Sequence, residues 1–273
     1  MTRDRGWGVV DIADTRMALE RAADRVVRLA ATAPDAEVAV PESDWTVRDV
    51  LVHLALGAEA YLTYVNGATE PFVDVSDVAG GSLARSSAAK LAGDPERDLL
   101  ALTTRVSAAM ASLLDATAGR HSNDPVMWNA VPLELGSMLA MGLGEYLLHG
   151  LDIARALSQP WRIEPEDARL VLAAAMPLLP LLVNPATTAG VRVAYDLRIR
   201  GGERFMVRID DGALAVGRSD GRVDCHVSAE PASLLLVAYG RRSQWIPVLT
   251  GKLTAWGRKP WTGLRLTRYI VTP

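Results

Sequence analysis

The sequence predicts a bundle of α-helices followed by a small α+β domain. Apolar residues recur every three to four positions through most of the first two-thirds of the chain, as in amphipathic helices. After Asn184-Pro185 the period changes to two, which is typical of strands. The chain has 273 residues, 49% of them hydrophobic, enough for two domains with their own cores. We therefore expect a helical domain over residues 1–185 and an α+β domain over residues 186–273.

The first two helices have recognisable ends. The first is expected from Ile12 to Ala31, with apolar residues on one stripe and charged residues opposite. Thr46 precedes Asp49 by three residues, which is the spacing of a capping box at a helix start. This second helix is expected to run to Val65 and to stop at Asn66-Gly67, a common C-terminal signal.

The next part of the chain alternates between loops and helices. Residues 67 to 93 are rich in Gly, Ser, Ala and Asp and are expected to form a long loop with a short helical piece. Asp94-Pro95 resembles an N-cap followed by proline, so a third helix is expected from there to about Ala118. After a loop over 119–132, two more helices are expected, at Leu133–Leu157 and Glu164–Val183.

The α+β part begins with a predicted hairpin. Residues Val191 to Arg200 alternate with period two, Gly201-Gly202 follows, and a second alternating run covers Phe205 to Ile209. Further short strands are expected at Ala213–Val216, Arg222–Ser228 and Lys252–Trp256, with helices at Ala232–Tyr239 and from about Pro260.

Composition argues against several classes of partner. The net charge is −3 with acids and bases interspersed, whereas nucleic-acid binding needs a dense basic face. The apolar stretch Leu170–Val183 is short for a membrane span and is interrupted by prolines. The N-terminus lacks the apolar core of a signal peptide, and the single cysteine, Cys225, allows no disulfide within the chain. We expect a cytoplasmic protein with neither nucleic acid nor membrane as a partner.

Ionisable residues inside the apolar run Leu133–Leu157 predict a metal site. Glu145 and His149 lie one helical turn apart on one face, where unpaired ionisable groups would be costly. His53 lies in a similar apolar segment of the second helix. Two histidines and one glutamate form a common catalytic zinc set with an open fourth position, although Fe²⁺, Ni²⁺ and Mn²⁺ also suit these ligands. The alternative is that both histidines are hydrogen-bonded core residues and that Glu145 pairs with Arg155 or with a neighbouring backbone group.

Asp152 shares the face of Glu145 and His149 and has three readings. It holds a ligand imidazole in place, as metal-bound histidines commonly require. Alternatively it faces the substrate, or it is a surface aspartate paired with Arg155 or with solvent.

Two segments together resemble the mycothiol-dependent maleylpyruvate isomerase family. They are Trp45–Leu54 and Gly144–Ala154. The family has a Trp-Ser/Thr-Val-Arg-Asp helix start with a ligand histidine, then Glu-x-x-x-His-x-x-Asp on the fourth helix. Each of these motif positions matches here, and the resemblance covers roughly the first 160 residues. The resemblance implies a DinB-like metal-binding four-helix bundle. It also implies that His53, Glu145 and His149 are zinc ligands, with water or thiol in the open position.

The C-terminal part resembles the sterol-carrier-like domain that is often fused to this bundle. The matching features are the paired strands around Gly201-Gly202, the strand Val223–Val227, the helix from Ala232 and the segment Leu249–Leu253. The resemblance implies that this domain helps to close the active site. Arg242 and Arg258 are then candidates for contact with an anionic group of the substrate or thiol.

The expected function is that of a metal-dependent enzyme with a low-molecular-weight thiol, mycothiol, as the nucleophile. Its substrate would be a small electrophile, and it would act as an S-transferase, a thiol-exchange enzyme or a thiol-dependent isomerase. Asp152 would be catalytic, Arg85 would hold a substrate carboxylate, and the chain would be a monomer or homodimer. Three alternatives stay open: a zinc-dependent hydrolase, a noncatalytic ligand-binding protein, and a structural or regulatory partner of another enzyme.

Overall fold

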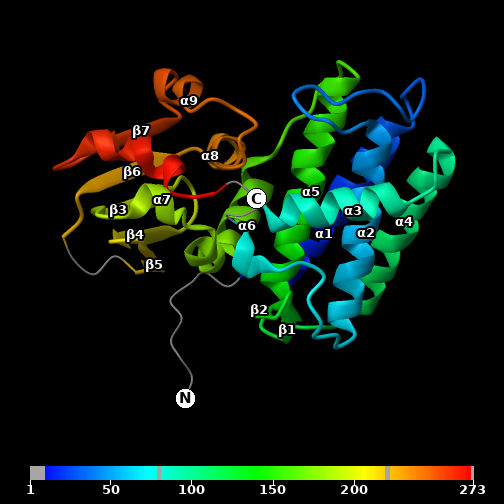
Figure 1. Ribbon diagram of the computed structural model, residues 1–273, viewed down its shortest axis with the longest axis horizontal. Coiled ribbons are helices and arrows are strands. Elements are labelled where there is room, and N and C mark those ends of the chain that lie inside the picture. Colours follow the sequence, from blue (N-terminus) through cyan, green and yellow to red (C-terminus); the bar gives the residue numbers. More distant parts are fainter. Residues whose placement is uncertain (1–9, 79–80, 219–221, 272–273) are drawn as a thin grey trace. The chain divides into compact units, whose positions relative to one another are not determined.

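A computed structural model describes residues 10–78, 81–218 and 222–271. It confirms the predicted class, because helices are followed by a mixed sheet (Figure 1). The chain divides into a bundle unit, Val10–Asp74 with Ser82–Ile163, and a C-terminal unit that begins at Glu164 and also takes in Val75–Gly81. This division lies upstream of the expected boundary at residue 185, because the helix that follows Glu164 packs on a helix of the C-terminal unit.

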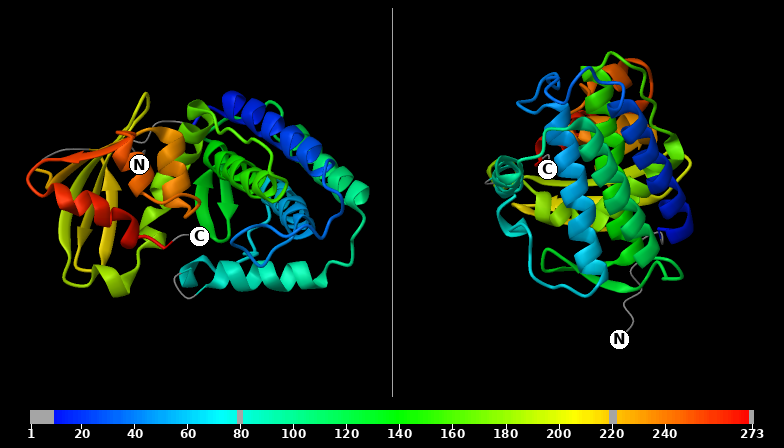
Figure 2. Two further views of the ribbon diagram at one scale, coloured as in Figure 1. Left: turned by 90° about the horizontal axis from the view of Figure 1, so that it is seen from above. Right: turned by 90° about the vertical axis from the view of Figure 1, so that its right-hand side faces the viewer.

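Four helices form the core of the bundle unit. Each contacts two others, so that they close a ring, and they run side by side in Figures 1 and 2. Their bounds are α1 Ile12–Ala30, α2 Val47–Val65, α4 Leu99–Ala116 and α5 Leu135–Ala156. The capping box at the start of α2 is present, since Thr46 and Asp49 each accept a hydrogen bond from the backbone N–H of the other. The apolar stripes predicted from the sequence thus meet inside this ring.

The segment between α2 and α4 differs from the prediction. A twelve-residue helix, α3 (Ser82–Gly93), occupies part of the expected loop, and a short 3₁₀ turn, η1 (Val75–Asp77), precedes it. The helix expected at Asp94-Pro95 begins instead at Leu99, with Asp98 as its N-cap. The predicted start was wrong by about four residues: Oδ1 of Asp94 accepts a hydrogen bond from the backbone N–H of Glu96 at 3.0 Å and Oδ2 is bound by Arg105 at 2.6 Å, but this turn does not continue into the α-helix.

A small hairpin precedes α5. Its strands are β1 (Pro125–Trp128) and β2 (Val131–Glu134). Most of this segment was expected to be a loop, but Leu133 and Glu134 were expected to begin the helix, which starts instead at Leu135. Asn129 and Ala130 both have positive φ, which fits the tight turn of a two-residue hairpin. The strands are short and contain prolines, so the sequence pattern of a hairpin is weak.

Two glycines allow close contacts along the buried helix α5. A Cβ at Gly150 would lie 2.1 Å from the Trp161 ring, and one at Gly142 would lie 2.8 Å from Tyr61. The Trp161 indole also donates a hydrogen bond to the carbonyl oxygen of Leu147 at 2.9 Å. The Trp161 ring is thus held both by its contact with Gly150 and by its hydrogen bond to Leu147, so it has little room to move.

Gly150→Ala is expected to destabilise the protein by about 2 kcal/mol, because overpacking against Trp161 outweighs the gain in helix propensity. Gly57 in α2 is the matched control, because a Cβ there would meet nothing within 4 Å. Gly57→Ala is expected to stabilise by about 0.5 to 1 kcal/mol. Urea unfolding measures the change in unfolding free energy for each variant. Equal changes in Gly150→Ala and Gly57→Ala would show that the contact with Trp161 is not tight.

The C-terminal unit contains a five-stranded sheet in the order β5-β4-β3-β6-β7 (Figure 1). Its strands are β3 Arg192–Ile199, β4 Arg204–Asp210, β5 Ala213–Gly217, β6 Cys225–Ala229 and β7 Leu253–Trp256. The predicted hairpin is confirmed as the antiparallel pair β3–β4, while β3 and β6 are parallel. A 3₁₀ segment, η3 (Pro260–Arg268, red in Figure 2), covers the face that includes Tyr195, whose hydroxyl donates to the carbonyl oxygen of Thr262.

Helices complete this unit. They are α6 Pro165–Ala175, η2 Met176–Leu182, α7 Pro185–Thr188, α8 Pro231–Ala238 and α9 Trp245–Leu249. The helix expected to continue to Val183 changes to 3₁₀ geometry at Met176. Pro177 and Pro180 cause the change, since proline has no N–H to donate to an α-helical hydrogen bond.

Asp196, in the central strand β3, is fully buried but charged. Burial alone would raise its pKa, but hydrogen bonds from Arg204, His226 and Arg198 more than offset this and lower the pKa to about 2. A carboxylate with a lowered folded-state pKa stabilises the fold above the pKa of the unfolded chain and stops doing so as the pH falls through the folded value.

Asp196 is therefore expected to contribute about 2 kcal/mol of stability at neutral pH that is lost as the pH falls from about 4 toward 2. The measurement is the difference in unfolding free energy between the wild type and Asp196→Asn, followed with pH. That difference is expected to shrink on acidification. A difference that stays constant with pH would contradict the assignment.

Helix α4 is the only helix among the described residues that is long and apolar enough to span a membrane by length and composition. One such helix is weak evidence for a span, and α4 contacts α1 and α2 within the bundle.

Candidate metal centre

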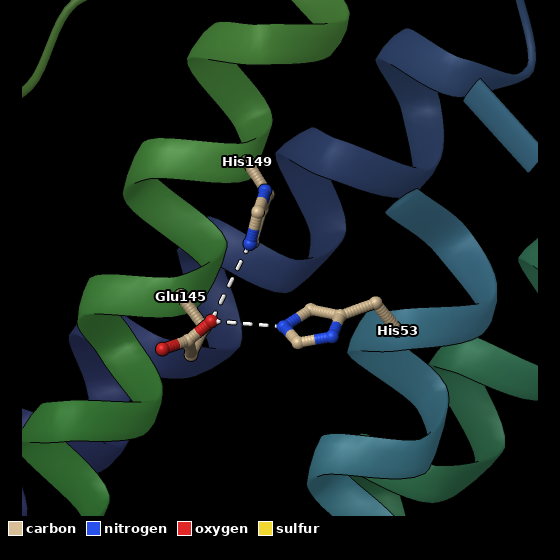
Figure 3. A group of neighbouring side chains, drawn as sticks. All are labelled: His53, Glu145 and His149. Carbon is tan, nitrogen blue, oxygen red and sulfur yellow. Dashed lines mark hydrogen bonds and ion pairs between the residues drawn. The ribbon is translucent and has the colours of Figure 1, made fainter. Parts of the chain in front are cut away.

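Two neighbouring helices bring three predicted ligands together. His53 projects from α2, and Glu145 and His149 project from α5, with the Glu145 carboxylate between the two imidazoles (Figure 3). Their possible ligand atoms all lie within 4.8 Å of one another. The one-turn spacing of Glu145 and His149 and the contact between α2 and α5 produce this convergence.

The distances within the cluster suit a small cation. Oε2 of Glu145 lies 3.1 Å from Nε2 of His53 and 3.4 Å from Nε2 of His149. Donor atoms of a tetrahedral zinc site, with bonds of about 2.0 to 2.1 Å, are separated by about 3.3 to 3.4 Å. The 3.4 Å edge of the donor triangle therefore already has the required length, and the 3.1 Å edge is slightly shorter. The Glu145 side chain is 44% exposed and that of His53 26%, so a fourth ligand can approach from solvent.

Asp152 orients one imidazole. Its Oδ2 lies 3.1 Å from Nδ1 of His149, and both side chains are buried. A proton on Nδ1 that is donated to this carboxylate leaves the lone pair on Nε2, which faces Glu145 and His53. Metal-bound histidines in proteins are commonly held in this way.

Charge in the cluster is strongly perturbed. Burial would lower the pKa of His149, but hydrogen bonds to Asp152 and Glu145 more than offset this and raise it to about 9. Burial would also raise the pKa of Glu145, but His149 and His53 hold it well below its usual range. A carboxylate that stays negative beside two imidazoles is an environment in which a divalent cation can bind.

Trp45 packs against both imidazoles. Its ring is stacked on His149 at 5.5 Å between centroids with an interplanar angle of 19°, and it lies 5.1 Å from the ring of His53. The two imidazoles approach each other edge to face at 4.9 Å. Trp45 therefore restricts the rotation of both candidate ligands from one side.

Comparison with known proteins identifies the family. Residues 16–154 match the family described as "Mycothiol maleylpyruvate isomerase N-terminal domain", and this match covers half of the chain. The chain belongs to this family. The resemblance predicted from Trp45–Leu54 and Gly144–Ala154 is thus confirmed, and with it the expectation of an enzyme family.

Solved structures share the fold over nearly the whole chain. Two of them are mycothiol-dependent maleylpyruvate isomerase and a histidine-to-alanine mutant of it. They are 16% and 15% identical to this chain, with TM-scores of 0.53 and 0.54, and the alignments cover 89% of this chain and 92% of theirs. No curated protein sequence matches the chain.

The three arginines predicted to bind substrate or thiol have different surroundings in this member of the family. Arg85 is exposed on α3 in the bundle unit. Arg242 is half-buried in the C-terminal unit, between α8 and α9. Arg258 is paired with Asp224, which Lys259 also contacts at 3.3 Å. Their roles toward a ligand stay predictions.

Sequence reasoning named Trp45 only as part of a motif and missed its contact with both imidazoles. The available signal was its position one residue before the cap of α2. His53 lies about two helical turns after that cap, in the same helix. His226 was not among the predicted site residues, and the structure places its Nδ1 2.6 Å from the buried carboxylate of Asp196.

Trp45→Ala is expected to weaken zinc binding about tenfold or more, as does loss of other groups that orient metal ligands. Trp45→Phe retains an aromatic ring and should recover most of the affinity. Competition with a chelator measures zinc affinity, and thermal unfolding of the metal-free variants reports on any general loss of stability. Unchanged affinity in the alanine variant would show that Trp45 does not orient the ligands.

Proposed function

We propose that this chain is a metal-dependent enzyme that uses a low-molecular-weight thiol, mycothiol, as the nucleophile toward a small electrophile. The convergence of His53, Glu145 and His149 carries the proposal. The family supports the choice of thiol, since its name and the solved structures refer to mycothiol-dependent isomerisation.

The donor set fits zinc, with other divalent metals as second choices. His53, Glu145 and His149 would hold the ion. When bound there, Zn²⁺ supplies the positive charge that keeps a thiol deprotonated near neutral pH. Asp152 keeps His149 in the tautomer that presents Nε2, and the exposed side of Glu145 leaves the thiol a route of approach.

The thiolate then acts on the substrate. In an isomerase it adds to a conjugated double bond, the resulting single bond rotates, and elimination of the same thiolate restores the double bond in the other geometry. In a transferase it displaces a leaving group and remains in the product. Arg85, Arg242 and Arg258 would bind anionic groups of the thiol or substrate, because guanidinium groups pair well with carboxylates.

Several further expectations belong to this proposal. Residues 186–273 form a sterol-carrier-like domain, which is the part of the C-terminal unit that contains its sheet. The protein works in the cytoplasm as a monomer or homodimer, without nucleic acid or membrane as a partner.

The test is turnover with defined components. Metal-free protein is supplied with Zn²⁺, mycothiol and maleylpyruvate, or with other small electrophiles, and isomer and thiol adduct are measured. The proposal predicts that product formation requires both zinc and thiol. Product formed equally well without thiol would contradict it.

A zinc-dependent hydrolase is the second candidate, because the same His₂Glu set can activate water. The exposure of Glu145 is compatible with either nucleophile. Release of an acid or amine in the absence of thiol, with zinc still required, would favour this candidate.

A further inference from the structure

The outer face of the C-terminal sheet carries an unusual row of side chains. The pairing register places Met206, Asp196, His226 and Trp256 side by side across β4, β3, β6 and β7. This face is opposite the one that contains Tyr195 and is covered by η3. Within the row, Asp196 is fully buried although it points away from the η3 side.

Cationic side chains surround Asp196. Arg204 binds its carboxylate through Nε and, at 2.8 Å, through a terminal nitrogen, while Nε of Arg198 donates to it at 2.9 Å. His226 contacts the same oxygen as Arg198 and is stacked on Trp256 at 17°. Trp256 also lies 5.2 Å from the Arg198 guanidinium. The Asp196 carboxylate thus binds two guanidinium groups and one imidazole at the same time.

This arrangement has more positive charge than its own stability requires. Arg198 and Arg204 are directly opposite each other on neighbouring strands, and like charges in that position destabilise a sheet. Arg208 is on the same face, and within the described part of the chain its one side-chain hydrogen bond is to the sulfur of Met206. The outward positions of β3 and β4 carry four arginines, including Arg192, against two aspartates.

The guanidinium groups also have free donors on the solvent side. Arg198 uses only Nε toward Asp196, and in the described part of the chain its terminal nitrogens have no hydrogen-bond partner. The side chains of Arg198 and Arg204 are 40% and 51% exposed. A fixed pair of guanidiniums beside an imidazole is suited to the oxygens of a phosphate group, which accept several charge-assisted hydrogen bonds.

We propose that this row is a binding site for the phosphate group of a phosphate monoester, with Arg198, Arg204 and His226 as the ligand contacts and Asp196 as the residue that positions them. The site is separate from the metal centre in its residues and does not depend on the proposed thiol chemistry.

Histidine NMR of the full chain tests the site, because the chain has only four histidines and His226 lies within the row. Inorganic phosphate and glycerol 3-phosphate are each titrated at low salt. The ring-proton signal of His226 is expected to shift saturably. Arg198→Gln should weaken binding about tenfold or more, whereas Arg192→Gln, on the same face but paired with Asp210, should change it less than about twofold.

The variants are chosen so that folding does not obscure the result. Arg198→Gln leaves Asp196 in contact with Arg204 and His226. If it still unfolds, Arg208→Gln breaks no ion pair among the described residues and should weaken binding by about threefold. The absence of a saturable shift at His226, or equal losses in Arg192→Gln and Arg198→Gln, would overturn the proposal.

The source of the phosphate group is decided by a second arm. Phosphatidylcholine vesicles with and without phosphatidic acid are sedimented with the protein. Tighter binding of glycerol 3-phosphate than of inorganic phosphate, without sedimentation, assigns a soluble ester. Sedimentation that needs phosphatidic acid and is abolished in Arg198→Gln supports the same site with a lipid head group as the source.

Discussion

His149→Ala is expected to lose zinc binding and thiol-dependent turnover together. The variant removes one of three ligands, and two remaining donors do not hold zinc at the affinity of a three-ligand site. It also leaves Asp152 buried without the imidazole that it contacts at 3.1 Å. Elemental analysis after dialysis and turnover with mycothiol measure the two losses.

His121→Ala is the matched control for this variant. His121 is exposed in the segment before β1, and its substitution removes an imidazole without removing a ligand. The control should retain metal and activity at the wild-type level. Full metal content and activity in His149→Ala would refute the metal centre.

Asp152→Asn is expected to keep the fold but to reduce zinc affinity or turnover by about 10- to 100-fold, as with other residues that orient metal-bound histidines. An amide can present its oxygen or its NH₂ group to Nδ1 of His149, so the tautomer with Nε2 as the ligand atom is no longer enforced. The substitution also removes the negative charge that raises the pKa of His149.

The effect of Asp152→Asn is separated from a general loss of charge by Asp115→Asn, at an exposed position of α4. Chelator competition and steady-state kinetics are run on both variants. If Asp152→Asn matches Asp115→Asn in both measurements, Asp152 is a structural residue and not part of the site.

Local sequence signals predicted the parts of the fold that depend on local chemistry. The capping box at Thr46 and Asp49 and the Gly201-Gly202 hairpin are present in the structure. The signals were misleading about where some elements begin. Asp94 accepts a hydrogen bond from the backbone N–H of Glu96, as an N-cap does, but α4 starts only after Asp98, and the β1–β2 hairpin is too short to show a period.

The candidate site could be predicted because its spacing is helical. Glu145 and His149 must share a face of any helix that contains both, and one further histidine in an apolar helix completes the set. The surroundings could not be predicted in the same way. The contact of Trp45 with both imidazoles depends on how α2 and α5 pack, and the row at Asp196 depends on the register of four strands.

Cobalt substitution tests the central claim most directly, because Co²⁺ takes the place of zinc and its absorption reports on the ligands. We predict that the metal-free chain binds one Co²⁺ through His53, Glu145 and His149. Addition of mycothiol should then produce the charge-transfer band of a cobalt–thiolate bond. The account would be contradicted by a wild-type chain that binds no cobalt, or by a His149→Ala variant that binds cobalt as tightly as the wild type does. It would also be contradicted by a cobalt spectrum that does not change when the thiol is added.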